Sequence, residues 1–186
     1  MRIYLRAFEL DDYKLINKWR KDEEDYKLIG GNKYYVSSER DKKWVEEKIF
    51  KDAKDIYLAI CLKENDEMIG YLSLNNIDWR NRKVEWGGIT IGEKKHRGKG
   101  YANEAAYLML DFAFSELGIH RFYGHWLEAN KASIMLGKKL GFKHEGVLRD
   151  SVYKNNNFNN VVVMSILKEE FEIIKDNYKS EVITKE

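Results

Sequence analysis

Proline is absent from the 186 residues, and cysteine occurs only once, as Cys61. A single cysteine excludes an intrachain disulfide, and its place in the apolar run 57–62 indicates a buried thiol rather than a nucleophile. No apolar run reaches the roughly 20 residues of a membrane-spanning helix, and the first residues lack the apolar core of a signal peptide. We therefore expect a cytoplasmic protein that does not cross a membrane.

A large excess of charge of either sign is also missing. The net charge is only +2, although 34% of the residues are charged. Proteins that bind nucleic acid usually concentrate basic residues on one face, and the only dense basic cluster here lies within residues 94–99. We therefore do not expect a nucleic-acid partner.

The length and the hydrophobic content predict one domain. With 44% hydrophobic and 13% aromatic residues, the chain is long enough to form one proper core. Helical spacing of apolar residues begins near residues 12, 38, 101 and 131, and again after residue 168. Segments typical of strands lie at 2–8, 56–62, 68–77, 82–91, 121–127, 143–153 and 161–167. We interpret residues 1–186 as a single domain, with a core over about residues 2–168 and a C-terminal helix and tail over 169–186.

Residues 89–105 read as a strand, a loop and the start of a helix, and the loop has the composition of an anion site. Gly98 and Gly100 allow positive φ angles and a close approach of the backbone to a ligand. Amide groups at a helix start attract anions. Four cationic side chains lie in the same few residues: Lys94, Lys95, Arg97 and Lys99. We interpret this loop as a pyrophosphate cradle.

Two common phosphate loops do not fit these residues. The nucleoside triphosphate loop has four residues between its first glycine and its Gly-Lys pair, followed by a hydroxyl residue. Here five residues separate Gly92 from Gly98, and Gly100 stands at the hydroxyl position. The dinucleotide loop needs a small residue where Asn103 stands and an acidic residue on the next strand, where only Glu128 is available.

The pattern that does fit is Arg-x-x-Gly-x-Ala, formed by Arg97, Gly100 and Ala102. Three further motifs follow it along the chain: Asn130-Lys-Ala-Ser133, Lys139-Leu-Gly-Phe142 and Glu145-Gly-Val-Leu-Arg149. In this combination the chain resembles the GNAT superfamily of N-acetyltransferases, and within it the ribosomal-protein alanine and spermidine acetyltransferases.

This resemblance implies an α/β (α+β) fold with a mostly antiparallel mixed sheet of about seven strands, splayed in the middle and flanked by helices. It implies acetyl-CoA as co-substrate, with the pyrophosphate on the loop and the pantetheine arm between the strands 82–91 and 121–127. The first two helices would frame the acceptor pocket. The residues implied to contact acetyl-CoA are Ile89, Ile91, Arg97, Gly98, Lys99, Gly100, Tyr101, Ala102, Asn130 and Ser133.

Acetyl transfer to an amine requires two proton movements. The ammonium, with a pKa of about 10, must lose a proton, and the departing thiolate, with a pKa of about 8.5, benefits from gaining one. Glu85 stands where similar enzymes often carry a glutamate that acts as general base through water; alternatively it faces solvent or pairs with Arg82. A backbone amide near Ile89, freed by an irregularity at Gly87 and Gly88, could stabilise the oxyanion.

The general acid is the point at which this chain departs from its relatives. They often carry a tyrosine five residues before the phenylalanine of the Leu-Gly-Phe motif, where this chain has Gly137. Ser133 lies one helical turn earlier and is our first candidate, although its hydroxyl could instead cap the helix. Tyr153 is the second candidate, and we expect the substitution Gly137→Tyr to be tolerated.

We expect an acetyl-CoA-dependent N-acetyltransferase that acts on a primary amine by direct attack in a ternary complex. The acceptor could be a protein N-terminus, a polyamine or an amino sugar, and a homodimer is a candidate assembly. The alternative is a non-catalytic acyl-CoA-binding domain of the same fold. The histidines do not converge, so we expect no metal site, and we interpret His96 as solvated. The acidic run 22–25 is either a solvated face or an attractor of a cationic acceptor.

Overall fold

The computed structural model describes residues 1–22, 35–51 and 54–183, with the backbone alone for 177–183. One sheet of seven strands runs through it, in the order β1-β2-β3-β4-β5-β7-β6. Neighbouring strands are antiparallel, except for β4 and β5, which are parallel. The strands are β1 (Ile3–Ala7), β2 (Ile56–Leu62), β3 (Met68–Asp78), β4 (Lys83–Ile91), β5 (Arg121–Leu127), β6 (Lys143–Lys154) and β7 (Asn157–Leu167). This is the mixed, mostly antiparallel sheet that the sequence predicts.

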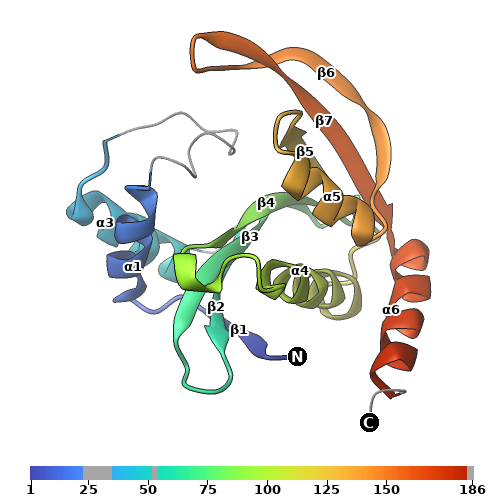
Figure 1. Cartoon of the computed structure of the whole chain (residues 1–186), viewed down its shortest axis with the longest axis horizontal. Helices are drawn as coiled ribbons and strands as arrows, with labels where there is room; N and C mark the ends of the chain where they lie inside the picture. Colours follow the sequence, from blue (N-terminus) through green and yellow to red (C-terminus); the bar gives the residue numbers. More distant parts are fainter. Residues whose placement is uncertain (23–34, 52–53, 184–186) are drawn as a thin grey trace.

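Helices cover both faces of this sheet (Figure 1). They are α1 (Asp12–Arg20), α3 (Ser38–Phe50), η1 (Lys94–His96), α4 (Tyr101–Asp111), η2 (Phe112–Glu116), α5 (Lys131–Lys139) and α6 (Lys168–Ile183). The segment η2 is a π-helical turn, so the helix expected to begin near residue 101 changes its hydrogen bonding near its end. No helix in the described part of the chain is both long and apolar enough to cross a membrane.

Alternation along β2 shows how the two faces are built. Ala59 and Cys61 belong to the apolar cluster under α1 and α3, whereas Ile60 and Leu62 belong to the larger cluster that includes α4 and α5. Cys61 has no exposed surface, and burial raises the pKa of its thiol. The prediction of a buried thiol is therefore confirmed.

The sheet opens between its two parallel strands. Strand β4 pairs with β5 at only three positions, from Lys83↔Arg121 to Glu85↔Tyr123, and beyond Glu85 the two strands no longer pair with each other. On the other side of β4, the register with β3 slips at Gly87, because Ser73 faces Gly88 while Leu74 faces Trp86. Both the splay and the bulge at the paired glycines are as the sequence predicts, and both begin within two residues of Glu85.

A polar ladder crosses β5, β7 and β6 near the base of the opening. Arg121 of β5 donates two hydrogen bonds to the carboxylate of Glu145 of β6, at 2.7 and 2.5 Å. Ser165 of β7 lies between them and donates its hydroxyl to the same carboxylate at 2.7 Å. These bonds, from Arg121 first and then from Ser165, hold the pKa of Glu145 at about 2.

We expect Glu145→Gln to lower the free energy of unfolding by about 0.5–1 kcal/mol at pH 7, the range of partly exposed ion pairs. Because the folded-state pKa is depressed below the ordinary 4.5, this stabilisation is present above pH 4.5 and is lost as the pH falls towards 2. Urea unfolding from pH 7 to pH 3 measures the difference, with Glu172→Gln on the exposed side of α6 as control. A difference that stays constant down to pH 3 would contradict this assignment.

Candidate functional site

The loop between β4 and α4 has the open, left-handed backbone that its glycines predict. Gly98 has φ 74° and Gly100, the residue before α4, has φ 87°. A Cβ atom built on Gly98 would meet no atom within 4 Å, so a ligand can approach this backbone closely. Within the described residues, no backbone carbonyl accepts from the amides of residues 98–102. An anion with several acceptor oxygens fits such a set of free amides.

The Arg97 side chain fastens this loop to the end of β4. Its Nε donates to the carbonyl of Ile91 at 2.8 Å and its Nη2 to the carbonyl of Gly92 at 3.2 Å. The guanidinium also lies 3.7 Å from the carboxylate of Asp22. These contacts give Arg97 a structural role in shaping the loop, and a direct contact with phosphate stays a prediction.

Arg2 is a second support of the loop, and no sequence motif predicts it. Its Nη2 donates to the carbonyl of Lys99 at 2.8 Å, and its Nε and backbone amide each donate to the buried carboxylate of Glu104 at 2.7 Å. The guanidinium stacks 4.3 Å from the centre of the Tyr101 ring. The residue that precedes β1 thus adds a cation beside the start of α4.

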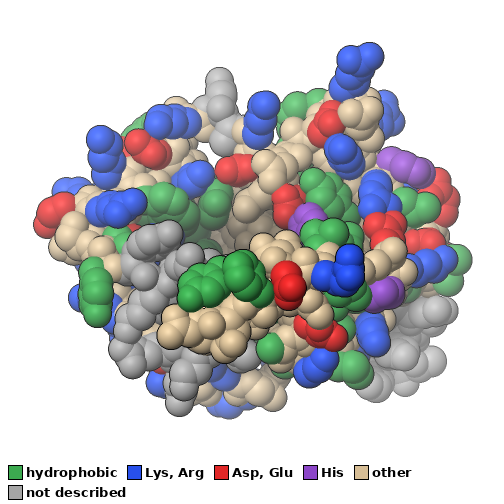
Figure 2. Space-filling model, turned by 90° about the horizontal axis from the view of Figure 1, so that it is seen from above, with side chains coloured by type: hydrophobic (Ala, Val, Ile, Leu, Met, Phe, Trp, Pro, Cys, Tyr) green, Lys and Arg blue, Asp and Glu red, His purple; other side chains and the backbone are tan. Residues whose placement is uncertain are grey.

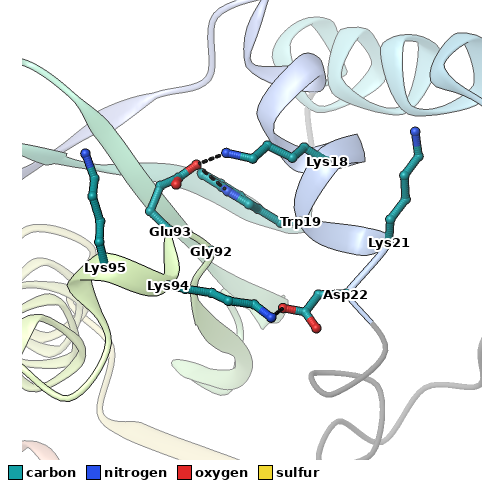
Figure 3. A pocket seen from close by; sticks show the side chains of 8 residues that line it. All are labelled: Lys18, Trp19, Lys21, Asp22, Gly92, Glu93, Lys94 and Lys95. Carbon is teal, nitrogen blue, oxygen red and sulfur yellow. Dashed lines mark hydrogen bonds and ion pairs between the residues drawn. The ribbon is translucent and has the colours of Figure 1, made fainter.

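A cavity of about 770 Å³ lies between this loop and the end of α1 (Figure 3). Glu93 reaches across it, accepting hydrogen bonds from Lys18 at 2.6 Å and from the indole of Trp19 at 3.0 Å. Asp22 pairs with Lys94 at 3.0 Å. Asp22 is therefore bound to the loop rather than solvated, and residues 23–25 of the acidic run lie outside the described residues.

His96 is not the solvated residue that we expected. Its side chain is only 11% exposed, and its ring packs edge-on against Tyr101 with 5.6 Å between centroids. Its Nε2 lies 3.6 Å from the carboxylate of Glu67. The correction has a simple cause, because η1 folds the loop back onto the turn between β2 and β3.

Glu85 lies where β4 and β5 separate, and its carboxylate has two partners. Its Oε1 lies 2.8 Å from Nδ1 of His125, and its Oε2 accepts from the side-chain amide of Asn76 at 2.6 Å. It therefore neither pairs with Arg82 nor simply faces solvent. Sequence reasoning missed both partners, although His125 could have been found from the register, since Tyr123 faces Glu85 and His125 is the next residue on that face.

Comparison with known proteins identifies the family to which the chain belongs. A family model described as the acetyltransferase (GNAT) domain matches residues 2–143. The chain belongs to the GNAT family.

Its GNAT relatives and structural neighbours are N-acetyltransferases. The uncharacterized N-acetyltransferase p20 of Bacillus licheniformis is 32% identical over 171 residues, which cover 91% of this chain and 95% of the relative. The spermidine N(1)-acetyltransferase of Vibrio cholerae is 31% identical over 104 residues, which cover 56% of this chain and 59% of the relative. A crystal structure of spermidine N-acetyltransferase from Vibrio cholerae in complex with CoA and spermine matches with a TM-score of 0.83 and 25% identity, covering 91% of this chain and 98% of that one.

Two polar residues, Asn130 and Ser133, are predicted to contact the pantetheine arm on the far side of the GNAT splay, and that contact stays a prediction. The Oδ1 of Asn130 accepts from the backbone amide of Ser133 at 3.1 Å, so Asn130 caps α5. The capping role considered for Ser133 therefore belongs to Asn130. Ser133 is half-buried in the first turn of α5, which leaves its hydroxyl a candidate for contact with a ligand.

Gly137 is buried, and its tolerance of a tyrosine stays a prediction. A Cβ atom built there would lie 2.8 Å from the Cε of Met164, with atoms of Phe142 and Trp126 at 3.8 Å. A whole tyrosine ring would require these core side chains to move. The nearest atom, Cε of Met164, is the flexible end of its side chain, and the other two lie at ordinary contact distance.

Tyr153 lies near the tip of the hairpin formed by β6 and β7, which arches over the sheet in Figure 1. It is 53% exposed, and its hydroxyl donates to Asn156 at 3.1 Å. Its ring packs on Phe158 with 5.2 Å between centroids. The described contacts of Tyr153 therefore belong to the hairpin and do not include Glu85 or Ser133.

Proposed function

We propose that this GNAT protein transfers the acetyl group of acetyl-CoA to a primary amine by direct attack in a ternary complex. The observation that carries the proposal is the layout of β4, which begins at the splay and leads into the open amide loop. At about 3.3 Å per residue, Glu85 and Ile91 are roughly 20 Å apart along the strand. An extended pantetheine arm could therefore follow β4 from the phosphate loop to the carboxylate.

The described residues fit acetyl-CoA, which supplies a thioester carbonyl and a thiol leaving group. The free amides of residues 98–102 would bind its pyrophosphate, with positive charge from Arg2 and Lys99 nearby. Ile89 and Ile91 on β4, together with Asn130 and Ser133 at the start of α5, would contact the pantetheine arm from opposite sides of the splay. The crystallised relative that binds CoA supports this assignment.

The chemistry would take place at the opening beside Glu85. We assign this carboxylate to driving the deprotonation of the acceptor ammonium, because it is the carboxylate at the point where the strands part. The bulge at Gly87 would supply fixed backbone amides for the oxyanion of the tetrahedral intermediate.

We propose a polyamine as the first acceptor to test. A hollow of about 390 Å³ between the start of α5 and the β6–β7 hairpin is lined by two carboxylates, those of Glu128 and Asp150, and by one ammonium, that of Lys131. Such a site suits an acceptor with several ammonium groups better than one with a single charge. Figure 2 shows cationic and anionic side chains interspersed over this view of the surface, which offers no broad basic face. A protein N-terminus and an amino sugar are the other candidates.

The test is to incubate the protein with acetyl-CoA and a panel of amines while measuring free thiol. The single thiol of the protein, Cys61, is buried, so the signal would report released CoA. Thiol release that depends on an amine supports the proposal. Tight CoA binding without amine-dependent release would instead support a non-catalytic acyl-CoA-binding domain, which the glycine at position 137 favours.

The leaving group can be tested by two conservative substitutions. We expect Ser133→Ala to lower kcat by roughly tenfold and Tyr153→Phe to leave it nearly unchanged, because Ser133 borders the splay while Tyr153 is bonded within the hairpin. A thiolate of pKa about 8.5 leaves moderately well without an acid, so activity should remain measurable. Loss of all activity in Tyr153→Phe, with CoA binding intact, would make Tyr153 the acid.

We also propose a cytoplasmic homodimer. Four apolar side chains of the β6–β7 hairpin are between 43% and 65% exposed: Val147, Leu148, Tyr153 and Phe158. A second copy of the chain could cover them. Light scattering would measure the assembly.

A further inference from the structure

The carboxylate of Glu85 is held from two sides by residues of neighbouring strands. Asn76 of β3 donates to one oxygen at 2.6 Å, and the imidazole of His125 of β5 lies 2.8 Å from the other. The side chains of Glu85 and His125 are 23% and 39% exposed, so the pair lies at the surface of the opening rather than in the core. This arrangement joins a fixed carboxylate to a partly exposed imidazole.

The backbone of β3 is shaped to deliver Asn76 to this carboxylate. Asn76 has φ 51°, a left-handed conformation that asparagine tolerates better than most residues. The pairing of β3 with β4 is interrupted between Asn75 and Asp78, and the amide of Asn76 donates to Asp55 at 3.0 Å. This irregularity turns the Asn76 side chain towards Glu85, which fixes the carboxylate before any ligand arrives.

The bond between Glu85 and His125 determines which ring nitrogen can accept a proton. An ionised carboxylate only accepts hydrogen bonds, so Nδ1 of His125 must carry the proton in this contact. In the neutral ring, Nε2 then holds the lone pair. A carboxylate that orients an imidazole in this way is the arrangement by which many enzymes prepare a general base.

Among the residues that the structure describes, the other groups around His125 add no competing charge. The Tyr123 ring packs edge-on with 5.9 Å between centroids, and burial followed by the nearby Glu85 raises the pKa of its phenol, which stays neutral. Val163 faces His125 from β7. Arg121 lies further along β5 and is bonded to Glu145.

We propose that His125 is the group that takes the proton from the acceptor ammonium, with Glu85 and Asn76 as positioning residues behind it. This inference rests on the proposed acetyltransferase function. Nε2 would remove one proton from the ammonium and release it to solvent. The neutral amine then forms its bond to the thioester carbon, the carbon–sulfur bond breaks, and the second amine proton passes to the thiolate, which gives the amide and free thiol.

The first test compares His125→Gln with His120→Gln. His120 is a matched control because it is also a partly exposed histidine beside a carboxylate, 3.8 Å from Glu169 and away from the opening. We expect His125→Gln to lower kcat about 10²-fold at neutral pH, with CoA affinity unchanged, and His120→Gln to have no effect. The defect should shrink as the pH approaches the pKa of the acceptor, because the amine then arrives neutral. An unchanged kcat and pH profile in an active preparation would overturn the inference.

Two further measurements distinguish a role of Glu85 and His125 in proton transfer from a purely structural role. If the pair acts as a unit, the double variant Glu85→Gln/His125→Gln should be little slower than the slower single variant. Nitrogen NMR of the imidazole in the protein without ligand should place the proton of neutral His125 on Nδ1, and Glu85→Gln should weaken that preference. A proton on Nε2 or fully additive rate effects would each contradict the proposal.

Failure of the inference and failure of the proposed function give different results. If the wild-type protein acetylates no amine, the function fails, whatever the tautomer of His125. If the wild-type protein is active and His125→Gln behaves like His120→Gln, the function stands and His125 has no part in it.

Discussion

Glu85→Gln should lower the rate of amine acetylation by about 10² to 10⁴ at neutral pH, with little change in CoA affinity. The substitution keeps the shape of the side chain and removes the charge that holds His125 at 2.8 Å. An amide also cannot accept the proton of the acceptor ammonium, so both the direct role of Glu85 and its role behind His125 predict a large loss. Steady-state rates with a saturating amine, together with calorimetry of CoA binding, measure the two effects.

The pH dependence of the rate distinguishes a loss of deprotonation from a loss of acceptor positioning in Glu85→Gln. If Glu85 serves deprotonation, the variant should recover as the pH rises, because the amine then loses its proton in water. A defect of constant size at every pH would indicate that the carboxylate positions the acceptor instead. Glu172→Gln, on the exposed side of α6, is the control for a change of charge alone.

Gly100→Val should weaken CoA binding by roughly tenfold to a hundredfold. Its φ of 87° is left-handed, and a β-branched side chain strongly disfavours that conformation. The added side chain would also displace the phosphate from the loop amides, and losing one hydrogen bond to a charged group costs about 1.5–3 kcal/mol. Calorimetry measures the affinity directly. Melting with CoA gives an independent value, because a ligand at a hundred times its Kd stabilises by about 2.7 kcal/mol.

Gly118→Val is a matched control for the backbone strain of that substitution. Gly118 has φ 65°, and a Cβ atom there would meet nothing within 4 Å, but it lies in the turn before β5. Both variants should lose stability through the same left-handed strain, and only Gly100→Val should lose affinity. If a folded Gly100→Val protein binds CoA as tightly as the wild type, the phosphate loop has been wrongly assigned.

Local patterns in the sequence predict much of this fold and of its ligand loop. Alternating apolar residues predict the seven strands, the paired glycines predict the bulge opposite Ser73, and Gly98 and Gly100 predict the left-handed turns before α4. Each of these features depends on a few adjacent residues, because glycine and side-chain alternation act over that range.

The features that the sequence did not predict all depend on residues that meet only in the folded chain. The bond of Glu85 with His125 spans 40 residues and depends on the register of β4 against β5. The position of the Asn76 side chain depends on an irregularity of β3, and no glycine in that part of the strand predicts it. The packing around Gly137 depends on Met164, which lies on a strand that is distant in sequence. Pattern alone cannot supply such registers, since a shift of one residue exchanges the two faces of a strand.

The contact of Arg2 with Glu104 also has a consequence for how the protein folds. It joins residues 102 positions apart, and it completes the phosphate loop only after β1 has docked on β2. Closing so long a stretch of chain is entropically costly and tends to come late in folding. In a partly folded chain in which β1 has not yet docked, the loop before α4 would therefore lack the contacts of Arg2. Under the proposed function, tight CoA binding would for this reason be a property of the finished fold, and the ligand would favour the native state over any intermediate in which the first strand is still free.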